Sequence, residues 1–116
     1  MGFGGCFHDP IHLAGHFHES FVEPLLTSDG RLDGAMEFLR RMKFVRLDRF
    51  KELHAKLAMP TLFIWGADDP TFPEPLARRM ATQFPNVAGF HALRDAKLFF
   101  YEEHPKEVAR LIERFA

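Results

Sequence analysis

Two aspartates, Asp68 and Asp69, follow a short apolar run that reads TLFIW over residues 61–65. The run is rich in strand-forming residues, which predicts a strand covered on both faces, as in a parallel sheet. Catalytic and ligand-binding groups gather at the carboxyl ends of such strands because the connecting loops converge there. The simpler interpretation is turn chemistry, in which an aspartate beside Pro70 accepts backbone N–H bonds.

The elements that position these aspartates follow in the sequence. A helix is predicted over residues 74–84 and a second strand over residues 87–93. Strand, helix and strand in this order predict two adjacent parallel strands joined by a right-handed crossover. A final amphipathic helix is predicted between Pro105 and Phe115, with apolar residues at i, i+3, i+4 and i+7. Two strands alone leave exposed edges, so the pattern calls for further strands that nothing upstream supplies.

Upstream of the first strand, the chain predicts short helices broken by turns. Phe17, Phe21 and Leu25 repeat at i, i+4 and i+8, which marks one helical face. Pro24 is expected to kink or end this helix, because proline cannot continue the hydrogen-bond pattern. Residues 28–30, Ser-Asp-Gly, predict a turn.

Two more helices are expected beyond this turn. Asp33 is expected to cap one of them, and an apolar stripe from Leu47 to Leu57 marks the other. The chain therefore divides into a helical, cap-like segment, residues 1–46, and a strand-helix-strand-helix portion, residues 47–116. The expected class is α/β, with two parallel strands, flanking helices and a helical segment before them.

Residues 60–70 read PTLFIWGADDP and closely resemble a landmark of the α/β-hydrolase fold family, P-T-L-x-I-W-G-x-x-D. In that family the aspartate three residues after the glycine is the acid of the catalytic triad. The resemblance therefore maps the acid to Asp69, with Asp68 as its neighbour. It covers residues 47–115 and extends more loosely upstream, where the chain looks like the cap-to-core connection of the haloalkane-dehalogenase and epoxide-hydrolase branch. The chain thus resembles the C-terminal part of that fold.

The family's last strand is followed by G-H-x-x-x-x-E-x-P. Residues 103–105, Glu-His-Pro, match its end, but Leu98 stands at the histidine position and Lys97 at the glycine. Leucine cannot accept a proton, so the resemblance implies that the general base is missing. We expect Leu98 and Asp69 to lie together, with the carboxylate turned to water, backbone N–H groups or Lys97. His91 is an alternative base, although a structural histidine on a strand is the simpler interpretation.

The family's nucleophile is also missing. Its elbow reads G-x-Nuc-x-G. Residues 4–8, Gly-Gly-Cys-Phe-His, offer the first glycine and the thiol of Cys6, but His8 replaces the last glycine. The elbow and the oxyanion-hole loop belong to the first half of the family's fold, which we do not expect this chain to contain. Without them, the lone chain is expected to turn over no ester, epoxide or haloalkane.

Four histidines form a cluster near the start of the chain: His8, His12, His16 and His18. At spacing i, i+4, His12 and His16 would share a helix face and bind Zn²⁺ together with Asp9 or Glu19. Gly15 weakens such a helix, however, and no paired cysteines accompany the cluster. A partly exposed cap segment is the simpler interpretation, so no metal and no cofactor are expected.

The composition limits the classes of partner that the chain is expected to bind. The net charge is -1, from 15 Lys and Arg against 16 Asp and Glu, and no basic block suits nucleic acid. No apolar run approaches the roughly 20 residues that span a bilayer. One cysteine and no secretory signal make the cytoplasm the expected compartment. Fourteen phenylalanines are more than a chain of 116 residues is expected to bury, which favours a missing part of the fold.

Two functions follow as expectations. The first is a hydrolase of ester, epoxide or carbon–halogen bonds, of which this chain supplies the acid Asp69, with a small molecule as substrate of the full-length protein. The alternative is a non-catalytic binding or scaffold protein of the same fold, for which Leu98 is the supporting residue. Fold alone does not decide between them.

Overall fold

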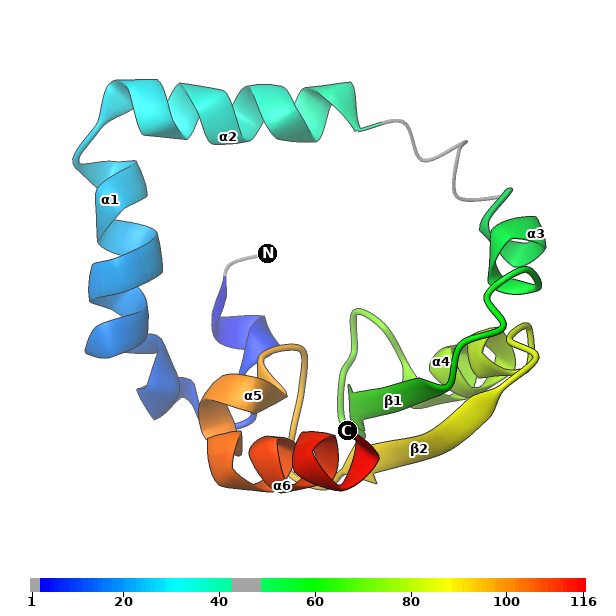
Figure 1. The fold of residues 1–116 in the computed structure, drawn as a ribbon. Coiled ribbons are helices and arrows are strands. Elements are labelled where there is room, and N and C mark those ends of the chain that lie inside the picture. Colours follow the sequence, from blue (N-terminus) through cyan, green and yellow to red (C-terminus); the bar gives the residue numbers. More distant parts are fainter. Residues whose placement is uncertain (1–2, 43–48) are drawn as a thin grey trace.

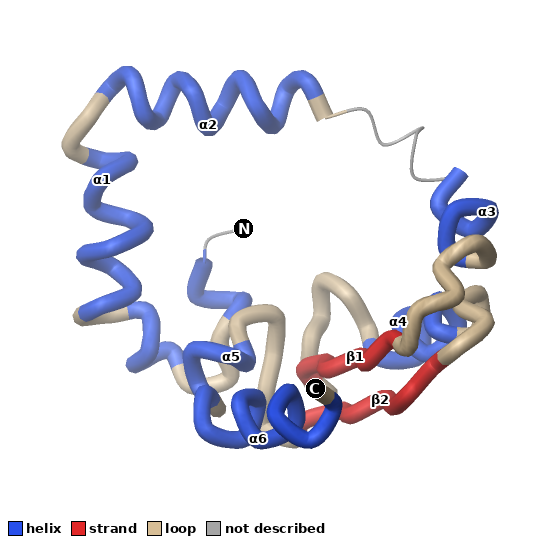
Figure 2. Tube along the Cα trace, viewed as in Figure 1, coloured by secondary structure: helices blue, strands red, loops and turns tan. Residues whose placement is uncertain are grey.

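A computed structural model describes residues 3–42 and 49–116, which form a mixed helix and strand structure (Figures 1 and 2). The strands are β1 (Thr61–Gly66) and β2 (Val87–Leu93). The helical elements are η1 (Phe3–Cys6), η2 (Pro10–Leu13), the π-helix η3 (His18–Val22), α1 (Glu23–Leu26), α2 (Asp29–Arg41), α3 (Phe50–His54), α4 (Glu74–Ala81), α5 (Phe100–Glu103) and α6 (Pro105–Phe115). The expected division between residues 46 and 47, and the start of the stripe at Leu47, lie outside the described residues.

The two strands pair in parallel, with Phe63 opposite Phe90 and Gly66 opposite Leu93. Helix α4 lies between them in sequence and packs on both, so the expected strand-helix-strand arrangement is confirmed. The helix ends at Ala81 rather than at residue 84. After Ala81 the chain continues in a tighter turn of the 3₁₀ type, in which the N–H of Phe84 donates to the Ala81 carbonyl three residues back (3.1 Å).

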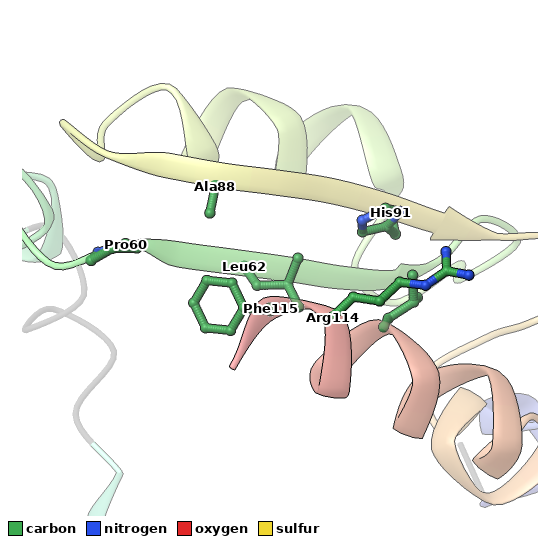
Figure 3. A pocket seen from close by; sticks show the side chains of 7 residues that line it. Pro60, Leu62, Ala88, His91, Arg114 and Phe115 are labelled. Atoms are coloured by element: carbon green, nitrogen blue, oxygen red, sulfur yellow. The ribbon is translucent and has the colours of Figure 1, made fainter.

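The sheet lies between two helices, with α4 on one face and α6 on the other (Figure 3). On the α4 side, Phe63 and Ala77 are buried. On the other side, a cavity of about 320 Å³ separates α6 from the strands, and Leu62, His91 and Leu111 are among its lining residues. The α6 face of the sheet is therefore incompletely filled.

A second core joins the start of the chain to the connection after β2. Phe7 is 0% exposed, and its ring lies 4.9 Å from that of Phe17 and 5.3 Å from that of Phe99. The Phe99 N–H donates to the Cys6 carbonyl at 3.0 Å. Residues that are more than ninety positions apart thus pack as one aromatic cluster.

The described part of the chain has an open outline. In Figure 1, α1 and α2 extend away from the sheet. The radius of gyration is 16.5 Å, against about 13 Å for a compact domain of this length. Large apolar side chains along α1 and α2 are exposed: Leu26, Leu32, Met36, Phe38 and Leu39. None of the described helices is long and apolar enough to cross a membrane.

The start of α2 corrects one expectation. Residues 28–30 do not form a separate turn, because the helix begins at Asp29 and includes Gly30. Ser28 is extended, with φ -143° and ψ 110°, and its carbonyl accepts the N–H groups of Arg31 and Leu32. Asp33 therefore lies inside the helix and does not cap it. The first turn of α2 forms around the carbonyl group of Ser28. Gly30, within this turn, costs about 1 kcal/mol of helix stability relative to alanine.

The helix around Pro24 continues, in a modified form. The wide turn η3 comes just before it, and the Glu23 N–H donates to the His18 carbonyl five residues back. Pro24 then occupies the first turn of α1. Because proline has no N–H to donate and crowds the preceding turn, a π-turn just before it lets the helix continue. Phe17 is buried on this face, whereas Phe21 is exposed.

We expect Phe7→Ala to lower the free energy of unfolding by about 3 kcal/mol, because it leaves a cavity among Phe17 and Phe99. Urea denaturation followed by circular dichroism measures the change. Ile11→Ala is the matched control, since Ile11 is 71% exposed and its truncation should leave stability nearly unchanged. Equal stabilities of the two variants would contradict the aromatic cluster.

Candidate functional site

The loop after β1 holds the carboxylate of Asp69 in a defined position. Asp69 is only 5% exposed, and its Oδ1 accepts the backbone N–H groups of Thr71 (2.8 Å) and Phe72 (3.1 Å). The indole N–H of Trp65, on the strand itself, donates to the Phe72 carbonyl at 2.7 Å. The strand therefore fixes the loop, and the loop fixes the acid.

The two loops at the strand ends cross in direct contact. A Cβ atom on Gly66 would lie 2.6 Å from the Ala96 carbonyl oxygen and still closer to that of Lys97, so only glycine fits. Two hydrogen bonds join the loops, Ala67 N–H to Leu93 O (2.8 Å) and Asp68 N–H to Ala96 O (2.9 Å). This crossing brings the segment after β2 beside the acid loop.

A cavity of about 250 Å³ lies at this crossing, and its lining is almost wholly apolar. It is lined by Ile64, Trp65, Gly66, Asp69, Phe72, Leu98 and Phe100. The expected neighbourhood of Asp69 and Leu98 is therefore confirmed, as is the expectation that backbone N–H groups receive the carboxylate. The catalytic role of Asp69 stays a prediction.

His91, the alternative base, lies elsewhere, and so does His104. His91 is among the residues that line the cavity under α6 (Figure 3), and the His104 Nε2 lies 3.0 Å from the Asp95 carbonyl oxygen. Across residues 3–42 and 49–116, no hydrogen bond joins a histidine to Asp69. The assignment of Leu98 to the family's histidine position stays a prediction.

Cys6 lies near the acid but is poorly suited to attack a substrate. Burial and the negative charge of Asp69 raise the pKa of the thiol, and the positive charge of Lys97 offsets part of this shift. A raised pKa leaves the sulfur protonated at neutral pH, whereas the thiolate is the nucleophile. Cys6 ends the short helix η1, with no strand before it in the described chain, so a strand-to-helix elbow is absent there.

The start of the chain is anchored beside the site by Glu103. Its two carboxylate oxygens accept the backbone N–H groups of His8 (3.0 Å) and Asp9 (2.8 Å). The imidazole of His8 then lies 3.6 Å from an Asp68 carboxylate oxygen and 3.8 Å from one of Asp95. Sequence reasoning missed this cluster, since its members come from three distant segments. Glu103 itself was marked only by its place in the family pattern.

The hypothesis of a shared face for His12 and His16 is wrong. His12 lies on η2, whereas His16 follows Gly15, whose φ of +64° reverses the local backbone. The His16 Nδ1 lies 3.3 Å from the hydroxyl of Ser20. The left-handed residue between the two histidines removes the continuous helix that the i, i+4 spacing required.

No protein-family model, curated protein or solved structure matches this chain.

We expect Asp69→Asn to speed the alkylation of Cys6 by iodoacetamide at pH 8, because removal of the carboxylate charge lowers the thiol pKa and raises the thiolate fraction. Asparagine keeps an oxygen for the Thr71 and Phe72 N–H groups, so the loop should persist. Lys97→Gln should have the opposite effect, since it removes a charge that favours the thiolate.

Asp33→Asn serves as the control for this experiment, because Asp33 is an exposed residue of α2. Its alkylation rate should equal that of the unmodified protein. An Asp69→Asn variant that reacts no faster than this control would show that the carboxylate does not act on Cys6.

Proposed function

We propose that this chain is the acid-bearing C-terminal part of an α/β-hydrolase-type hydrolase that cleaves ester, epoxide or carbon–halogen bonds. The observation that supports this proposal most strongly is the way in which the loop after β1 binds the carboxylate of Asp69. Its Oδ1 is held by two backbone N–H groups, whereas its Oδ2 takes part in no hydrogen bond among the described residues. A triad acid needs this division, with one oxygen fixed and the other ready to receive an imidazole N–H.

We also propose that the chain alone is inactive. Leu98 stands beside Asp69 where a general base is needed, and the raised pKa of Cys6 disfavours the one thiol near the acid. The family's nucleophile and oxyanion hole supply most of the transition-state stabilisation in such enzymes. The acid-bearing chain therefore depends on groups from outside it for turnover.

The shape of the described chain supports a larger parent fold. A parallel pair with two open edges is not stable by itself, and further strands would cover both edges and the exposed apolar side chains. The apolar cavity beside Asp69 suits the hydrocarbon part of a small molecule, with one polar group for orientation. Both features fit a small-molecule hydrolase.

A non-catalytic binding protein of the same fold is the second candidate. The observation that favours it is Leu98, which completes an apolar lining around the buried Asp69. In this case the cavity keeps its ligand-binding shape and the acid serves only to hold the loop.

The substitution Leu98→His tests whether Asp69 is poised to receive an imidazole. We expect the pKa of the introduced ring to lie above the ordinary value of about 6.5, because the adjacent carboxylate favours the protonated form. Titration of the ring protons by NMR measures it. Neither the wild-type chain nor the variant should catalyse turnover of nitrophenyl esters, epoxides or haloalkanes, since neither has a nucleophile elbow or an oxyanion hole.

The double variant Leu98→His with Asp69→Asn is the control, and its ring should titrate with a lower pKa than the ring of the single variant. If Asp69→Asn does not change the titration, the carboxylate is not directed at this position. The proposed acid role then fails, and the non-catalytic candidate is favoured.

A further inference from the structure

Three potential metal ligands from separate segments meet beside the acid loop. His8 follows η1, Asp68 follows β1 and Asp95 follows β2. One ligand atom from each lies within 4.8 Å of the other two. All three side chains are partly open to solvent, at 43%, 50% and 78% exposure, so an ion can reach them.

The three groups lie close enough for rotation of their exposed side chains to bring them around one ion. The His8 Nδ1 lies 3.6 Å from an Asp68 carboxylate oxygen, and the Nε2 of the same ring lies 3.8 Å from one of Asp95, so both contacts are too long for hydrogen bonds. Ligand atoms around a tetrahedral Zn²⁺ lie about 3.4 Å apart, given metal–ligand distances near 2.1 Å. Because an imidazole binds an ion through one ring nitrogen, the exposed side chains have to rotate so that both carboxylates approach the same nitrogen of His8. A divalent cation would also relieve the repulsion between two neighbouring carboxylates.

Backbone contacts already hold two of the three ligand residues, His8 and Asp68, in place. The Glu103 carboxylate binds the N–H groups of His8 and Asp9, and the Asp68 N–H donates to the Ala96 carbonyl. Burial of Phe7, the residue before His8, adds a second anchor. Because these contacts form without an ion, metal binding has to order only three side chains.

We propose that His8, Asp68 and Asp95 bind one divalent transition-metal ion of the zinc class. One imidazole and two carboxylates form a mixed nitrogen and oxygen set, which suits Zn²⁺ better than Mg²⁺ or Ca²⁺. The ion clips the start of the chain onto the ends of both strands, and water completes its coordination. This site is independent of the hydrolase proposal, since Asp69 is not among its ligands.

Isothermal titration of the metal-stripped, full 116-residue chain with ZnCl₂ tests the site. We expect one ion per chain, and binding at least tenfold weaker in His8→Ala and in Asp95→Asn. Glu103→Gln should weaken it by about 10- to 100-fold, the usual effect of a residue that positions a ligand. MgCl₂ should give no comparable binding. His18→Ala is the matched control, an exposed histidine of the same segment, and should bind as the wild type does.

Circular dichroism of each variant tests whether it is folded. Visible absorption of bound Co²⁺ provides a second readout, since a tetrahedral nitrogen and oxygen site gives visible bands, and His8→Ala should remove these bands. The absence of zinc binding to the wild-type chain overturns the proposal. So does binding that survives His8→Ala and is lost in His12→Ala or His16→Ala, since the ion then lies on the other histidines.

Discussion

The segment after β2 passes in close contact with Gly66, and this contact determines how the rest of the site is built. The carbonyl groups of Ala96 and Lys97 occupy the space that any side chain at this position would need. Because glycine leaves that space empty, the ends of β1 and β2 meet, and the Asp68 N–H can reach the Ala96 carbonyl. A β-carbon would force the two loops apart and separate the acid from the segment after β2.

Three features follow from this crossing. Leu98 reaches the cavity beside Asp69, and the next residue, Phe99, donates its N–H to the Cys6 carbonyl. Farther along, Glu103 receives the N–H groups of His8 and the residue after it. The start of the chain is thus held against the strand ends by hydrogen bonds as well as by the aromatic cluster. A buried acid, an apolar cavity and a pair of exposed carboxylates lie within one small region.

The parts of this structure that could be predicted are those that depend on local sequence patterns. The apolar run at residues 61–65 and the spacing of the last helix depend on near neighbours, and both elements are confirmed. The expected meeting of Asp69 and Leu98 followed from the resemblance to the hydrolase pattern, which places both at the carboxyl ends of neighbouring parallel strands. The start of α2 was misplaced because a Ser-Asp-Gly tripeptide suits a turn and a helix start equally well. The cluster around His8 had no local signal, since its partners are 60 and 87 positions away.

Leu98, and none of the described histidines, lines the cavity beside the buried Asp69. NOE spectroscopy on the chain with ¹³C-labelled leucine methyl groups tests this directly. We expect cross-peaks from the Leu98 methyl groups to the Asp69 β-protons and to the rings of Phe72 and Phe100, which line the same cavity. The ring protons of His91 and His104 should show none to Asp69. Cross-peaks between either histidine and Asp69, with none from Leu98, would contradict the assignment of the acid and its missing base.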